Sequence, residues 1–158
     1  KRRSVLMPRS EWMPRKYPKV DSEVSVLHGS AIFMKKENFF KLNGFDEKIF
    51  LYHDDDDISI RLKKEIGPLM YINNSEMIHL AGRSSSRDKQ ITSIKGYHMG
   101  RSRVCMQGKH KISGYKFKNI IFAIFQLFSL EMIFSPRKRT KYLYFAKGVF
   151  EEIFMQKN

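Results

Sequence analysis

Cysteine is almost absent from this chain of 158 residues, which has Cys105 as its single thiol. One cysteine excludes an internal disulfide and any metal site built from cysteines alone, and it fits a reducing compartment. Free cysteines are usually small buried hydrophobic side chains, and we expect the same of Cys105.

Long hydrophobic runs are also missing. The first eight residues, LysArgArgSerValLeuMetPro, have no apolar core of signal-peptide length, so secretion is not indicated. The most apolar stretch, Ile120 to Phe134, has 12 apolar residues in 15. As a helix it would extend roughly 22 Å, short of a hydrocarbon core of about 30 Å, so a full membrane span is not expected. The chain also lacks an initiator Met, which predicts a piece of a longer polypeptide.

Positive charge dominates, with a net value of +14 at pH 7. Eight of the 16 acidic residues fall between Glu37 and Glu65, whereas residues 83–118 hold ten Lys/Arg against Asp88 alone. A basic surface attracts nucleic acid, anionic lipid or phosphorylated small molecules, and its sign does not choose among them. A hydrophobic content of 42% predicts a folded chain, with one globular unit and an appendage.

Three segments follow from the composition. Residues 1–20 are expected to form a basic irregular arm, because three prolines fix backbone angles and remove hydrogen-bond donors. Residues 21–115 interleave predicted strands and helices, which indicates an α/β fold. Residues 116–158 predict a hydrophobic and basic helical tail. Its apolar stripe at helical spacing consists of Tyr142, Phe145, Ala146, Val149, Phe150, Ile153 and Phe154.

Within residues 21–115 the pattern predicts six elements, three of them strands and three of them helices. The strands are expected over 24–34, with Gly29 as an interruption, and over 69–72 and 76–80, around a turn at Asn73-Asn74. The helices are expected over 35–42, ended by Asn43-Gly44, over 55–66, and over 91–107.

Four consecutive carboxylates, Asp54 to Asp57, stand where the second of these helices is predicted to begin. Four like charges side by side repel one another. The cluster therefore needs a compensating positive field, which helix N–H groups, a metal cation or a bound polar substrate would each supply. We interpret it as a candidate site.

Several motifs in one order resemble the C-terminal half of family 2 glycosyltransferases, and bacterial rhamnosyltransferase-like members most of all. They are GlySerAla at Gly29, GlyPheAspGlu at 44–47, PheLeuTyr at 50–52, the acidic quartet leading into IleSerIleArgLeu, and MetIleHisLeuAlaGly at 77–82. The resemblance covers about residues 26–86. Asn43, Asp54 and Ile58 stand where the family usually has Gly, Glu and Leu.

The resemblance implies a GT-A fold, with a mixed sheet and flanking helices. It also implies a nucleotide-sugar donor, a divalent metal (Mn²⁺ or Mg²⁺), a saccharide or lipid-linked saccharide acceptor, and transfer with inversion. The family's N-terminal nucleotide-binding half has no counterpart among these residues, so the chain alone is expected to be incomplete. Cell-surface polysaccharide assembly is the implied pathway.

Asp55 aligns with the acid that the resemblance implies is the general base. A carboxylate within hydrogen-bond reach of a sugar hydroxyl accepts its proton as the oxygen attacks the anomeric carbon. The alternative is that one aspartate caps the helix and the others are solvated. Asp54 faces either the acceptor or the helix terminus. Asp57 and Arg61 form an i, i+4 pair that we interpret as structural, and Asp56 is expected to be exposed.

The remaining site predictions rest on the same resemblance. His79 is the implied metal ligand, and Arg83, Ser85 and Arg87 are implied contacts of the donor diphosphate. A structural histidine and a solvated loop are the alternatives. Gly29 and Ser30, with His28, are placed beside the acceptor, with a strand bulge as the alternative. The rings of Phe50 and Tyr52 either fill the core or form a sugar platform.

The basic tail predicts a peripheral location on anionic lipid at the inner, cytoplasmic face of a membrane. Its alternatives are a helical hairpin over the sheet and pairing with another subunit. A second functional class also stays open, namely a non-catalytic membrane-surface or partner-binding module derived from a glycosyltransferase. Nucleic acid is not an expected partner, since no binding motif accompanies the charge.

Overall fold

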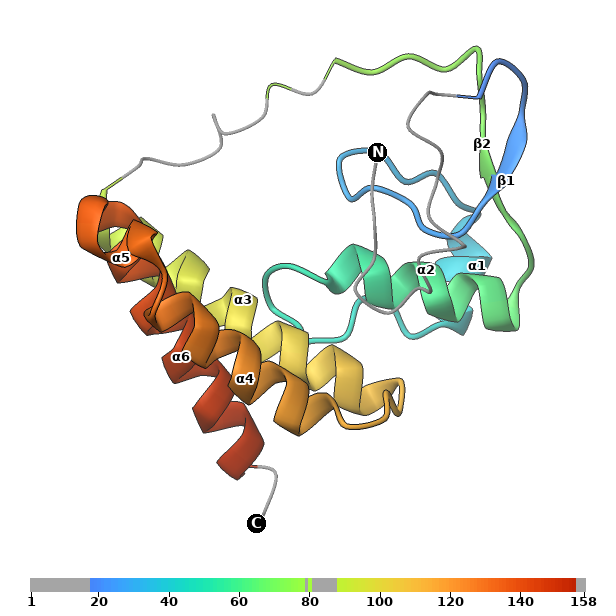
Figure 1. Cartoon of the computed structure of the whole chain (residues 1–158). Coiled ribbons are helices and arrows are strands. Elements are labelled where there is room, and N and C mark those ends of the chain that lie inside the picture. The colour runs from blue at the N-terminus through green and yellow to red at the C-terminus, as the bar shows by residue number, and fades with distance from the viewer. Residues whose placement is uncertain (1–17, 79, 81–87, 156–158) are drawn as a thin grey trace. The chain divides into compact units, whose positions relative to one another are not determined.

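The computed structural model describes residues 18–78, Leu80 and residues 88–155 (Figure 1). The elements in chain order are β1 (Ser22–Val24), α1 (Lys36–Lys41), α2 (Asp54–Glu65), β2 (Leu69–Tyr71), α3 (Lys89–Lys109), α4 (Tyr115–Leu127), α5 (Leu130–Phe134) and α6 (Pro136–Met155). Helices with one small sheet are compatible with the predicted α/β class.

The chain divides into two compact units. The first unit takes the described residues from 18 to 46 and from 54 to 80, with both strands and helices α1 and α2. The second unit takes residues 47–53 and the described residues from 88 to 155, with helices α3 to α6. The predicted helix at 91–107, observed as α3, therefore belongs with the tail helices.

The sheet of the first unit is a two-stranded antiparallel pair in which Val24 lies opposite Leu69. Both side chains are 5% exposed, and they pack with Ile58 and Leu62 of α2 and with Leu42. Burial of these apolar side chains holds the strand pair against the α2 helix.

The prediction of a long strand over 24–34 is wrong beyond Val24. The chain leaves the sheet there and turns at residues 28–31, where the N–H of Ala31 donates to the carbonyl of His28 at 3.0 Å. The N–H groups of Leu27 and Gly29 donate to side chains of α2 rather than to a neighbouring strand. Backbone donors satisfied in this way no longer need a ladder partner.

Local signals placed the two helices of the first unit correctly. After α1, the N–H of Gly44 donates to the carbonyl of Phe39 and that of Asn43 to Phe40, which is the Schellman pattern. Asn43 and Gly44 both have left-handed backbone angles, with φ of 57° and 68°. The prediction named the glycine, and asparagine shares the role because it tolerates this conformation.

The third predicted strand, over 76–80, is wrong for the described residues. Residues 76–78 and Leu80 lie outside any strand, and Ile78 is 88% exposed. The turn at Asn73-Asn74 is confirmed. Residues 69–71 form β2 as expected and pair with β1, which precedes both helices in the chain.

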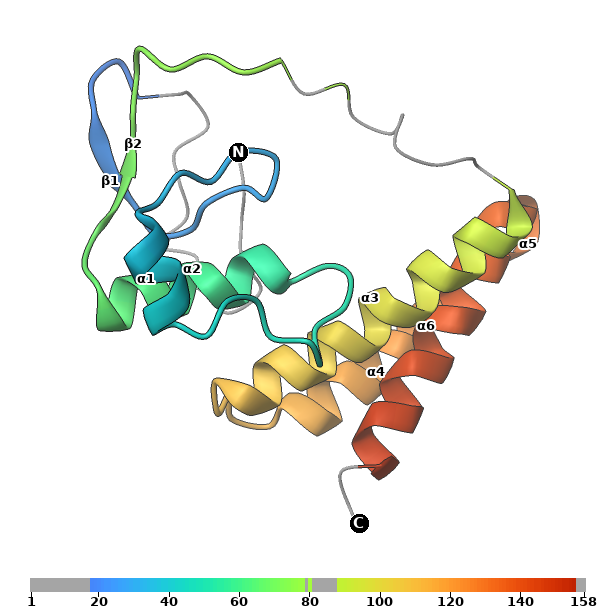
Figure 2. The same cartoon turned by 180° about the vertical axis from the view of Figure 1, so that it is seen from behind.

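Helices α3 and α6 lie side by side in the second unit, in the front view and from behind (Figure 2). Glycines make this approach close. A Cβ atom at Gly100 would lie 2.2 Å from the carbonyl oxygen of Phe145, and one at Gly148 would lie 2.1 Å from that of Tyr97. Small residues spaced four apart, Gly96 and Gly100, let the two backbones touch.

The predicted tail stripe is confirmed for four members, Phe145, Ala146, Val149 and Ile153, which are buried with Val104 and Ala123. Phe154 is 58% exposed. Cys105 is buried, as expected. Among the described residues, every helix is too short or too polar to cross a bilayer.

Candidate functional site

The acidic quartet forms the first turn of α2, as predicted. Negative side chains near the free N–H groups of a helix start are stabilised by the partial positive charge there. Asp55, Asp56 and Asp57 are 8%, 2% and 0% exposed, whereas Asp54 is half-buried. The predicted exposure of Asp56 is therefore wrong, because three successive residues of this first turn, and not only its inner side, are covered.

The carboxylate of Asp55 lies against the turn that contains Gly29. Its Oδ2 accepts the N–H of Gly29 at 2.8 Å, and its Oδ1 accepts the N–H of Asp56 at 3.0 Å. A Cβ atom at position 29 would lie 2.8 Å from Oδ2 and 3.3 Å from the Asp55 Cβ. A side chain at position 29 would therefore displace the Asp55 carboxylate, and glycine leaves room for its close approach to the backbone.

Ser59 supplies a second connection between α2 and the same loop. Its Oγ donates to the carbonyl oxygen of Asp55 at 2.6 Å and accepts the N–H of Leu27 at 3.0 Å. The serine is fully buried. Sequence reasoning missed this residue, although its position four residues after Asp55 places the two on one helix face.

The side chains beside Asp55 on the loop are polar and accessible. His28 and Gly29 are exposed, and the His28 Nδ1 lies 2.7 Å from the Ser30 Oγ. Gly29 was predicted to face an acceptor or to form a strand bulge, and it lies in a turn. The structure brings Asp55, Gly29 and Ser30 together. The buried carboxylate of Asp55 lies behind the turn, and the hydroxyl of Ser30 and the imidazole of His28 lie on the turn.

Asp57 and Arg61 form a structural pair, as interpreted from their spacing. The guanidinium contacts the Asp57 Oδ2 at 2.7 Å and also donates to the carbonyl oxygens of Leu42 at 2.7 Å and Gly44 at 2.9 Å. The two side chains are 13% and 1% exposed. This contact ties the C-terminal end of α1 to α2 and leaves Asp57 without a catalytic geometry.

Two residues with left-handed backbone angles directly precede the quartet, Tyr52 with φ of 67° and His53 with φ of 64°. Such angles are uncommon for a bulky side chain and are typical of functional or tightly constrained segments. Burial raises the pKa of the Tyr52 hydroxyl. Phe50 is 68% exposed with its ring 4.8 Å from that of His98, so it does not fill the core.

Four predicted site residues, His79, Arg83, Ser85 and Arg87, lie outside the described residues. Within residues 18–78 and 88–155, no group of three or more His, Cys, Asp or Glu side chains is placed to hold a metal ion. Within the quartet, Asp55 directs its carboxylate to backbone N–H groups and Asp57 directs its carboxylate to Arg61. These residues alone do not form the donor set of a divalent cation.

The chain is similar to N-acetylglucosaminyl-diphospho-decaprenol L-rhamnosyltransferase of Mycobacterium tuberculosis, strains CDC 1551 / Oshkosh and ATCC 25618 / H37Rv. Identity is 34% over 65 residues, which cover 41% of this chain and 21% of each relative. The match thus spans about a fifth of the relatives' length. No family model and no solved structure matches the chain. The likeness relates part of this chain to a glycosyltransferase.

Proposed function

We propose that the first unit is the acceptor side of an inverting glycosyltransferase with a GT-A fold. The substrates would be a nucleotide-sugar donor and a saccharide acceptor. The relatives are named for an acceptor in which the sugar is carried on a polyprenyl diphosphate. For this chain we propose the same class, a lipid-linked saccharide.

One observation carries the proposal: a buried carboxylate, Asp55, is held by a hydrogen bond of 2.8 Å behind an accessible turn that a glycine makes possible. The N–H groups of Gly29 and Asp56 each donate to one of its two oxygens, and these hydrogen bonds fix the orientation of the carboxylate. A carboxylate with a fixed orientation is the kind of group that accepts a proton from a hydroxyl within hydrogen-bond reach.

In the proposed reaction an acceptor hydroxyl gives its proton to Asp55 as its oxygen attacks the anomeric carbon of the donor sugar. The bond from that carbon to the nucleotide diphosphate breaks on the opposite face, so the configuration inverts. Asp54 and the Ser30 hydroxyl would bind acceptor hydroxyls, as the resemblance implies. The diphosphate leaves with the bonding electron pair.

Donor contacts remain predictions. Arg83, Ser85 and Arg87 would hold the diphosphate, and His79 would bind a divalent cation that offsets its charge.

The test compares Asp55→Asn with Ser59→Ala in the longest native polypeptide that carries these residues. Asp55→Asn removes the base, and kcat is expected to fall by about 10²- to 10⁴-fold. Ser59→Ala removes one hydrogen bond to the loop and one within α2 but keeps the carboxylate, so most of the activity should remain. Urea unfolding of both variants controls for stability.

Equal losses in the two variants would mean that Asp55 acts only by holding the loop. Full turnover in Asp55→Asn would remove it from the base role. Rescue of part of the rate by Asp55→Glu, with a changed pH profile, would support proton transfer.

A further inference from the structure

Helix α4 is apolar on both of its faces. Its inner face packs into the second unit through Ala123, which is fully buried, and through Ile120 and Leu127. Its outer face repeats large apolar side chains at helical spacing, and Phe117 and Phe125 are 68% and 74% exposed. A surface helix normally carries polar residues on this second face.

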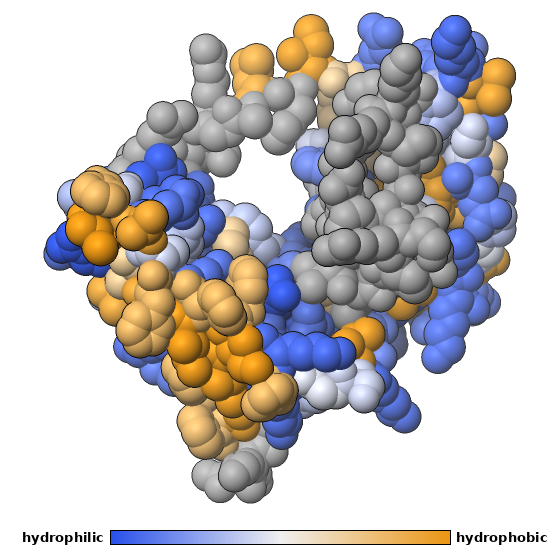
Figure 3. All heavy atoms as spheres, viewed as in Figure 1, coloured by the Kyte–Doolittle hydropathy of each residue, from blue (hydrophilic) through white to orange (hydrophobic). Residues whose placement is uncertain are grey.

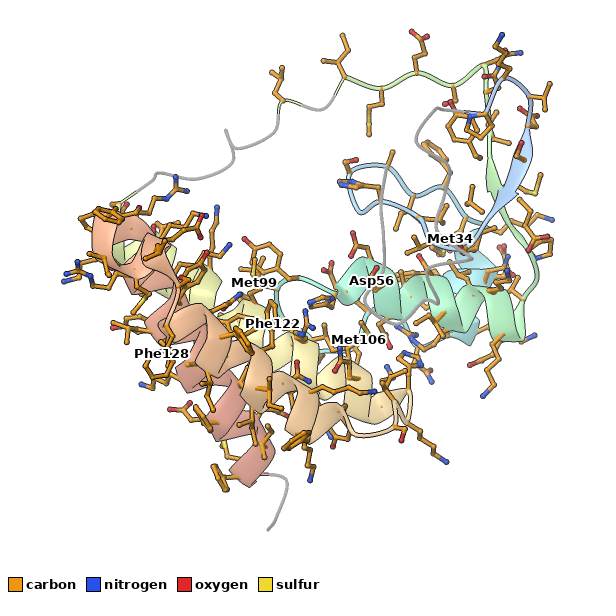
Figure 4. All side chains as sticks on the ribbon, viewed as in Figure 1. Met34, Asp56, Met99, Met106, Phe122 and Phe128 are labelled. Atoms are coloured by element: carbon orange, nitrogen blue, oxygen red, sulfur yellow. The ribbon has the colours of Figure 1, made fainter. Side chains whose placement is uncertain are left out.

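The same exposed character continues through the end of α4 and into α5. Phe128, Leu130 and Phe134 are 85%, 71% and 80% exposed. We refer to the exposed side chains of this stretch as the α4–α5 apolar face: Phe117, Ile121, Ile124, Phe125, Phe128, Leu130, Ile133 and Phe134. Figure 3 shows hydrophobic side chains gathered over these helices, and Figure 4 labels Phe128 at the edge of the unit. Exposed apolar area of this kind marks an interaction surface.

Basic residues stand at both ends of the apolar face in the chain. Residues 109–141 hold eight Lys/Arg against Glu131 alone: Lys109, Lys111, Lys116, Lys118, Arg137, Lys138, Arg139 and Lys141. Glu131 is itself paired with Lys138 at 3.0 Å. Burial, followed by repulsion from Lys138 and Arg137, lowers the pKa of Lys141. An anionic surface would relieve this repulsion.

We propose that the α4–α5 apolar face docks on an anionic lipid bilayer, with its phenylalanines at the level of the acyl chain boundary and the basic residues among the headgroups. The helix would lie along the surface, because α4 has 13 residues and none of the described helices crosses a bilayer. Aromatic and aliphatic side chains supply the buried area and lysines and arginines the attraction to charge. This proposal is independent of the proposed function.

A second copy of the chain is a poorer occupant. Two such faces would bring two sets of the same positive charges together, and like charges across an interface oppose association. Lipid headgroups of opposite charge complement the basic residues at both ends of the face. The surface therefore fits a membrane better than it fits itself.

Sedimentation with vesicles tests the proposal on the 158-residue chain. The chain should pellet with phosphatidylcholine vesicles that contain a quarter phosphatidylglycerol, and much less with pure phosphatidylcholine. High salt should reduce pelleting, since the attraction to headgroups is screened. Failure to pellet with the anionic vesicles, or equal pelleting with both vesicle types, would overturn the proposal.

Matched variants separate the two contributions. Phe125→Ser with Phe128→Ser should weaken the partition by roughly 100-fold, since each side chain loses its apolar burial. Lys116→Gln with Arg137→Gln should weaken it by roughly 30-fold. The controls are Phe33→Ser, at a fully exposed ring of the first unit, and Lys35→Gln with Lys41→Gln, which remove equal charge there.

Controls that lose as much binding as the test variants would contradict the assignment to this face. Analytical ultracentrifugation without lipid gives the remaining outcome. A dimer that the Phe125→Ser, Phe128→Ser variant abolishes would identify a second copy as the occupant and would also overturn the proposal.

Discussion

Gly100→Ala should destabilise the second unit, although alanine is the better helix former. In an unconstrained helix this change stabilises by about 1 kcal/mol. Here the new Cβ would lie 2.2 Å from the carbonyl oxygen of Phe145 and 3.2 Å from the Val149 Cγ2. The nearest atom belongs to the backbone of α6, so α3 and α6 must separate by roughly 1 Å to restore an ordinary contact.

The cost of such overpacking is typically about 1–3 kcal/mol. Because the atom that the new Cβ meets belongs to the rigid backbone of α6, we expect a cost near ~3 kcal/mol at this site. After subtraction of the helix-propensity gain, we expect a net loss of about 2 kcal/mol in the free energy of unfolding. Urea denaturation followed by circular dichroism at 222 nm measures it, because helices α3 to α6 supply most of the helical signal.

Gly108→Ala is the matched control in the same helix. The nearest atom to its new Cβ is the Tyr115 hydroxyl oxygen at 3.0 Å, at the far end of a side chain that can rotate. The change should be neutral or stabilise by less than about 1 kcal/mol. If Gly100→Ala is as stable as Gly108→Ala, close backbone packing between α3 and α6 is refuted.

Two further predictions concern charged and titrating groups. Arg61→Ala leaves the Asp57 carboxylate buried without its guanidinium and should cost about 3 kcal/mol in thermal unfolding of the first unit, whereas a loss below about 1 kcal/mol would show that the pair is not structural. Burial, followed by the charge of Arg101, lowers the pKa of His98 from its ordinary 6.5. Below pH 6.5 the folded state therefore binds fewer protons than the unfolded state. The stability that neutral His98 contributes is present above that pH and is lost as the pH falls. Between pH 7.5 and 5 the melting temperature should fall less for His98→Gln than for the native chain. An equal fall in both chains would show that His98 does not cause the loss of stability.

The elements that the sequence predicted correctly are those set by local signals. The α2 helix begins at its carboxylates and ends before Gly67, and its spacing of Ile58 and Leu62 matches their burial. The end of α1 follows from Asn43-Gly44 because both residues accept left-handed angles. These features depend on neighbours within a few residues, which a sequence displays directly.

Features set by distant partners escaped prediction. The run from Val24 to Met34 has the composition of a strand, but Ser59 and Asp55, about thirty residues later, take its backbone donors. Asn119 directly precedes the apolar stretch of α4, and it is fully buried, with its amide donating to Gln107 at 2.7 Å and accepting from Arg103 at 2.7 Å.

In the candidate site, the resemblance pointed to Asp55 and Gly29 separately, and the structure joins them with one hydrogen bond. Their close approach could not be read from the sequence, because it requires the turn that replaces the predicted strand. The role of Asp57 followed from the i, i+4 rule, whereas the burial of Asp56 depends on surroundings that no local pattern encodes.

The proton-accepting role of Asp55 is tested most directly by single turnover of prebound donor. The longest native polypeptide that carries these residues, in native and Asp55→Asn forms, is saturated with nucleotide sugar, mixed with acceptor and quenched. For Asp55→Asn we expect a donor Kd unchanged within about twofold and a transfer rate lower by at least about 100-fold. An unchanged transfer rate at equal donor occupancy would contradict it.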